Sequence, residues 1–154
     1  MIAAFPYICT VLAAAGVFAL RTEHPAAVIV PMVLIGIAAF AAALIQAVRN
    51  AARGLTAKRN LKIKCVQIPV YILNFALAII GVLMSVFGIP VILWAVAIDF
   101  LSILLTGVSA IGCGRDLLRA GKISSKQAVW MMIGSFVYCA DIVIAIAYYQ
   151  RSKK

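Results

Sequence analysis

The sequence predicts an all-α integral membrane protein, a compact bundle of about five transmembrane helices joined by short loops. The 154-residue chain is 66% hydrophobic and only 12% charged, whereas an ordinary soluble domain is about 45–50% apolar and about 25% charged. Its apolar residues gather in segments of about 20 residues, the length that crosses about 30 Å of hydrocarbon. Because the connections are too short for a soluble domain, we expect one transmembrane domain over residues 1–154.

Five spans are expected, over residues 1–20, 26–48, 66–87, 91–112 and 128–149. None of them contains Lys, Arg or Glu. Each span is expected to be helical, because backbone polar groups find no water to bond in hydrocarbon. The first segment lacks the basic start of a signal peptide, so it is interpreted as a span.

Local signals mark the element boundaries. Pro25 suits the first turn of the second span, where the missing N–H has no helical partner. Gly88-Ile89-Pro90 predicts a tight turn between the third and fourth spans. Ser124, followed three residues later by Gln127, is the capping-box pattern that opens a helix. Pro69 either kinks the third helix or marks its regular start.

The distribution of positive charge predicts the orientation. The connection over residues 49–64 carries six basic residues, and the connection over residues 114–127 carries four. Two spans separate them, so both are expected at the cytoplasmic face, with the N-terminus inside. The C-terminus is then outside, where its basic tail (Arg151, Lys153, Lys154) conflicts with the rule. The short loops favour a bacterial cytoplasmic membrane.

Two of the four acidic residues, Asp99 and Asp141, fall inside predicted spans. A carboxylate at the centre of a membrane helix costs about 2.5–3.5 kcal/mol on insertion scales, which makes it a functional candidate. With five antiparallel spans, each lies about 12 Å below the outer face at 1.5 Å per residue. No span supplies a basic partner, and at this matched depth the two carboxylates could share one proton- or cation-binding site. The alternatives are a protonated carboxyl bonded to a neighbouring helix and a seat for a basic residue of a partner subunit.

Polar and small residues recur at steps of three and four along the predicted spans, which indicates inward faces. Small residues at this spacing also let membrane helices pack closely, so for most of them packing is the favoured role. The polar ones are candidates to line the site together with the aspartates. These candidate ligand- or ion-binding residues are Asp99, Asp141, Asn74, Ser102, Thr106 and Tyr138.

These residues predict an oligomeric transporter or channel, since a thin bundle would more naturally enclose a pathway between protomers. The alternative is a non-catalytic membrane subunit (a chaperone, an immunity or resistance protein, or a regulator) that binds a partner membrane protein. An intramembrane aspartyl hydrolase is disfavoured. The residues before the two aspartates, Val96-Ala97-Ile98 and Tyr138-Cys139-Ala140, lack the glycines of the Gly-x-Gly-Asp motif of such proteases.

Other functional classes are disfavoured. The positive charge flanks helix ends, so membrane lipids are the expected partners and nucleic acid is not. The four cysteines (Cys9, Cys65, Cys113, Cys139) form no C-x-x-C and have no metal-ligand spacing. We therefore expect no metal, no cofactor and no disulfide chemistry.

Overall fold

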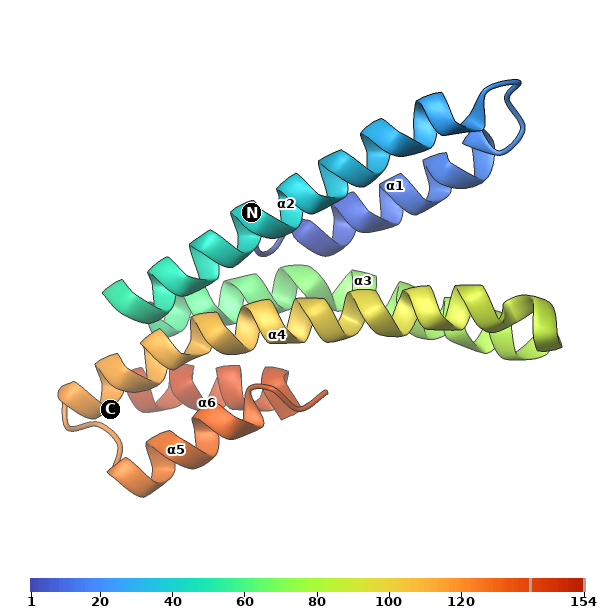
Figure 1. The fold of residues 1–154 in the computed structure, drawn as a ribbon. Coiled ribbons are helices and arrows are strands. Elements are labelled where there is room, and N and C mark those ends of the chain that lie inside the picture. The colour runs from blue at the N-terminus through green and yellow to red at the C-terminus, as the bar shows by residue number, and fades with distance from the viewer. Residues whose placement is uncertain (139, 154) are drawn as a thin grey trace.

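The computed structural model describes residues 1–138 and 140–153, and those residues form helices and turns without a strand. The chain runs as three successive helical hairpins, α1–α2, α3–α4 and α5–α6 (Figure 1). Helix α4 lies at the centre and contacts all the other elements. The elements are α1 (Phe5–Ala19), α2 (Pro25–Arg53), α3 (Ala57–Leu83), η1 (Ser85–Gly88), α4 (Ile89–Arg119), α5 (Ser125–Gly134) and α6 (Ala140–Lys153).

The predicted all-helical class is confirmed. Three segments, α2, α3 and η1 with α4, are long and apolar enough to cross a membrane by length and composition. Helix α1 is apolar but has only 15 residues. Only 11% of the most apolar window of α2 is buried inside the bundle. The apolar side chains of these helices therefore face outward, which in a soluble protein would expose a very large apolar surface.

The helices approach closely where glycine faces a neighbour. A Cβ on Gly112 of α4 would lie 2.1 Å from the carbonyl oxygen of Asn50 on α2. The Asn50 side chain also donates a hydrogen bond of 2.8 Å to Ser109, one turn away on α4. Close packing and an interhelical hydrogen bond thus join α2 to α4, as is common between membrane helices.

Two boundary predictions based on local chemistry are confirmed, and a third is displaced. Pro25 occupies the first turn of α2. The turn expected at Gly88-Ile89-Pro90 lies earlier, at Met84 and η1, and Ile89 and Pro90 belong to the first turn of α4. Ser124 and Gln127 form the reciprocal capping box of α5, with bonds of 3.3 and 3.2 Å. Pro69 lies inside α3 and does not mark its start.

The predicted connection over residues 49–64 is mostly helical. Only Gly54, Leu55 and Thr56 separate α2 from α3, and Gly54 makes the turn at φ 95°. Lys and Arg are good helix formers, so basic residues can end a hydrophobic span without ending the helix. As a result Lys64 belongs to α3, where its side chain is fully buried.

The prediction of a continuous helix over residues 128–149 is wrong. Helix α5 ends at Gly134, residues 135–138 form turns, and α6 begins at Ala140; Cys139 lies outside the described residues. Helix α6 runs back along α5 (Figure 1). Lys122, in the α4–α5 connection, donates a hydrogen bond to the carbonyl of Ser152 near the end of α6.

This reversal corrects the expected position of the C-terminal tail. Arg151 and Lys153 lie at the same end of the molecule as both basic connections (Figure 1), whereas the sequence places them at the opposite end; Lys154 lies outside the described residues. We call this end the basic end. It is formed by the ends of α2, α4 and α6 and the starts of α3 and α5, and it carries Arg49, Arg53, Lys58, Arg59, Lys62, Arg115, Arg119, Lys122, Lys126, Arg151 and Lys153.

Candidate functional site

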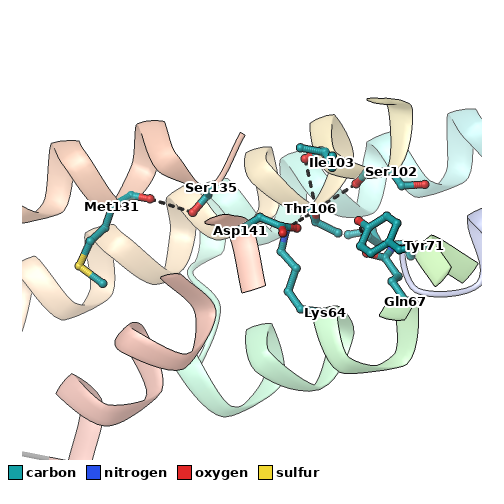
Figure 2. A network of polar contacts seen from close by, with 10 residues as sticks. Lys64, Gln67, Tyr71, Ser102, Ile103, Thr106, Met131, Ser135 and Asp141 are labelled. Carbon is teal, nitrogen blue, oxygen red and sulfur yellow. Dashed lines mark hydrogen bonds and ion pairs between the residues drawn. The ribbon is translucent and has the colours of Figure 1, made fainter. Parts of the chain in front are cut away.

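Asp141 forms a buried ion pair with Lys64. The Lys64 Nζ lies 2.6 Å from Asp141 Oδ2, and the two side chains are 0% and 1% exposed. The same ammonium donates a hydrogen bond of 2.5 Å to the Thr106 hydroxyl oxygen. Figure 2 shows the three side chains converging from α3, α4 and α6. A single ammonium therefore connects three helices.

Thr106 is oriented by its own helix. Its hydroxyl donates to the carbonyl oxygens of Ser102, at 2.9 Å, and Ile103, at 3.2 Å. Because its hydrogen points back along α4, the hydroxyl oxygen is left to accept from Lys64. The Ser102 hydroxyl is buried and has no hydrogen-bond partner in the described part of the chain.

The basic partner of Asp141 was missed because Lys64 was assigned to a connection. A signal for it exists in the sequence. On the third predicted span, Gln67, Tyr71 and Asn74 follow one another at steps of four and three. The same steps extend this polar face backward to Lys64 and Asn60. All five side chains are buried, so the inward face begins at Asn60, before the hydrophobic span does.

Asp99 has a different environment. The Asn74 amide donates a hydrogen bond of 2.6 Å to Asp99 Oδ1, while Asn74 is buried and Asp99 is half-buried. Among residues 1–138 and 140–153, no Lys or Arg forms an ion pair with Asp99. Asp99 lines a pocket of about 410 Å³, together with Asn74, Phe75, Ala78, Ala95, Val96, Phe100, Ile103, Phe136 and Tyr138.

Tyr138 lies at the edge of this pocket, on the turn between α5 and α6. Its ring meets the ring of Tyr71 edge-on, with centroids 5.9 Å apart. The Tyr71 hydroxyl donates to Gln67 Oε1 at 3.3 Å, and the Gln67 amide donates to the carbonyl of Ile2 at 3.0 Å. Buried polar groups thus continue from the pocket edge to the start of the chain.

The structure does not join the two carboxylates in one site. Asp141 is paired with Lys64, whose ammonium also donates to Thr106, and Asp99 accepts from Asn74. Asp99 and Thr106 are seven residues apart on α4, which is about 10 Å along the helix axis. The sequence candidates therefore divide into a sealed group around Asp141 and Thr106, with Ser102 adjoining it, and a pocket group of Asp99, Asn74 and Tyr138.

A metal site is not suggested by this arrangement, since the described residues contain no cluster of three His, Cys, Asp or Glu side chains. The fold and site instead define a class: an all-helical protein with three long apolar helices, a sealed ion pair and a half-buried carboxylate in an apolar pocket. The chain belongs to the family DUF6652, described as a family of unknown function, which it matches over residues 5–154. Neither a curated protein nor a solved structure matches the chain.

Proposed function

We propose that the chain is an integral membrane protein in which residues 1–19, whose start is bonded to Gln46 of α2, and helices α2 to α4 cross the bilayer. The α5–α6 pair enters it as a hairpin from the basic end. The outward apolar side chains of α2 support insertion. Every described Lys and Arg other than Arg21 and the buried Lys64 lies at the basic end. The positive-inside rule assigns that end to the cytoplasm, in a bacterial cytoplasmic membrane. Four crossings and a returning hairpin replace five crossings, and the basic tail then obeys the rule.

The topology is tested by labelling cysteines in intact cells with a membrane-impermeant maleimide. In a variant whose exposed Cys65 is replaced by serine, we expect Lys153→Cys to react only after the membrane is permeabilised. Thr22→Cys, in the α1–α2 connection, is the matched control and should react in intact cells. Labelling of Lys153→Cys in intact cells would refute this topology and support the five-span arrangement.

We propose that the protein is a small transporter or channel in which Asp99 binds a proton or cation. The observation that carries this proposal is a half-buried carboxylate, without a cationic partner among the described residues, in a pocket between apolar helices. Asp141 is already neutralised by Lys64, so it and Thr106 hold the bundle together rather than bind the ion. Phe75 and Phe100 are 62% and 65% exposed; the pocket therefore opens on the side of the bundle, and a second copy would enclose a pathway.

Flux measurements in liposomes test this proposal. The purified protein should carry a proton or monovalent cation down a gradient, and Asp99→Asn should remove that flux while the helical content stays unchanged. Glu23→Gln, in the exposed α1–α2 connection, is the matched control and should transport like the natural protein. Absence of flux, or flux that survives Asp99→Asn, would refute the proposal.

The same pocket supports a second candidate, a non-catalytic subunit that places Asp99 against a basic side chain of a partner membrane protein. A carboxylate that lacks a cationic partner in apolar surroundings is stabilised by such a charge. This candidate predicts a partner that co-purifies from the native membrane and is lost in Asp99→Asn. An aspartyl hydrolase receives no such support, because the two carboxylates have separate partners.

A further inference from the structure

The pocket at Asp99 has a composition that a proton site alone would not require. Four aromatic side chains (Phe75, Phe100, Phe136, Tyr138) and aliphatic ones surround a single carboxylate. Its volume of about 410 Å³ falls in the range of small-molecule sites, about 300–1,000 Å³. These features point to a ligand with both a positive charge and a substantial apolar body.

An inorganic cation fits this pocket poorly. A hard divalent ion takes six or more oxygen ligands, whereas the polar lining consists of Asp99, Asn74 and Tyr138. The Asn74 amide nitrogen is directed at Asp99 Oδ1, so Asn74 acts there as a donor that orients the carboxylate. The remaining lining offers aromatic faces and alkyl groups, which solvate an organic cation rather than a bare ion.

Aromatic rings attract organic cations through their negative faces, by about 0.5–1 kcal/mol at exposed sites and about 2 when desolvated. A quaternary ammonium or phosphonium centre has no N–H to hydrogen-bond, so rings and one carboxylate suffice to hold it. Phe136 lies close to α4, because a Cβ on Gly107 would be 2.7 Å from its ring. The absence of a side chain at Gly107 thus makes room for one wall of the pocket.

The opening of the pocket agrees with such a ligand. Phe75 on α3 and Phe100 on α4 are each more than half exposed, and both belong to long apolar helices. In a bilayer the opening of a single copy would face the acyl chains, into which an amphipathic cation partitions and a hydrated ion does not. We propose that the Asp99 pocket binds an amphipathic organic cation, a proposal that rests on the proposed function and names its substrate class.

Binding of tetraphenylphosphonium to the full-length protein in nanodiscs tests the proposal. Tetraphenylborate, which has the same shape and the opposite charge, is the matched ligand. We expect saturable binding of the cation, no saturable binding of the anion, and a loss of at least tenfold in affinity with Asp99→Asn. Asp99→Glu should retain binding, which separates loss of charge from loss of fold.

Substitutions of aromatic residues test whether the rings that line the pocket contribute to binding. Phe136→Ala should weaken tetraphenylphosphonium binding about three- to thirtyfold, the span of single cation–π contacts. Phe87→Ala is the matched control: Phe87 lies on η1, is 85% exposed and does not line the pocket, and its loss should leave binding unchanged. Equal uptake of both ions, or cation binding that Asp99→Asn does not alter, would refute the proposal.

Different results would refute the transport proposal and the organic-cation proposal. Proton flux that depends on Asp99, without saturable binding of the phosphonium, would reject the organic-cation inference and leave the transporter proposal standing. Saturable binding that depends on Asp99, without flux of any ion, would reject transport and support a binding pocket for organic cations.

Discussion

Asp141 and Asp99 are carboxylates in the same apolar bundle, and their surroundings differ in three respects. Asp141 is 1% exposed at its side chain, is neutralised by Lys64 and shares that ammonium with Thr106. Asp99 is half-buried, accepts a hydrogen bond from the neutral amide of Asn74, and faces a pocket. The difference indicates that the two acids have different roles: Asp141 joins helices through Lys64, whereas Asp99 is accessible from the pocket.

The largest effect on stability is expected when the positive charge of Lys64 is removed. Lys64→Met leaves Asp141 buried without its cation, and breaking a buried pair costs about 3–5 kcal/mol. We expect a loss of that size in the free energy of unfolding, measured in mixed micelles. Lys62→Met, at an exposed site on the same helix, is the control and should change stability by less than about 0.5 kcal/mol. An equal effect of both variants would contradict the assignment.

A smaller loss is expected when only the hydroxyl at Thr106 is removed. Thr106→Val keeps the shape and the ion pair but deletes the oxygen that accepts from Lys64, and hydrogen bonds to charged groups contribute about 1.5–3 kcal/mol. The same unfolding assay measures it. The control is Thr10→Val, because the Thr10 hydroxyl donates to the carbonyl of Pro6 within its own helix.

Asp99→Asn should have a smaller effect still. The new amide can accept from Asn74 as the carboxylate does, so we expect a change in unfolding free energy of less than about 1 kcal/mol. Asp141→Asn in the same assay should cost several times more, because it leaves the Lys64 ammonium unneutralised. If the two variants destabilise equally, the distinction between a sealed and an open carboxylate fails.

The smallest change in stability is expected for Gly107→Ala. The added methyl meets the ring of Phe136, a partly exposed side chain that can shift. Alanine is favoured over glycine in a helix by about 0.5–1 kcal/mol, which offsets part of that cost, so we expect a net loss of less than about 1 kcal/mol. The variant should alter ligand binding at the Asp99 pocket while the ion pair of Asp141 stays intact. Gly16→Ala is the control, since its methyl would make an ordinary 3.7 Å contact with Met32.

Features set by neighbouring residues could be predicted from the sequence. The Ser124–Gln127 capping box and Pro25 in the first turn of α2 depend on atoms a few residues apart, and both were correct. The helical class followed from composition. The inward polar face of α4 was also predicted, because it repeats at steps of three and four.

Features set by tertiary contacts could not be predicted in the same way. Hydropathy shows that residues 128–149 are apolar but carries no information on where the chain reverses, so two helices were taken for one span. Lys64 was counted as a charge outside the bundle, because a lone lysine ends a hydrophobic segment. Only the packing of α3, α4 and α6 brings its ammonium to Asp141 and reveals that the two acids have separate partners.

The ion pair also bears on the order of synthesis, because its two residues lie 77 positions apart. Lys64 emerges from the ribosome well before Asp141 is made, so the nascent helices hold an ammonium without a counter-charge until the last hairpin arrives. A chain truncated before α6 would keep that uncompensated charge. We therefore expect stable packing around Lys64 only after α6 has been made.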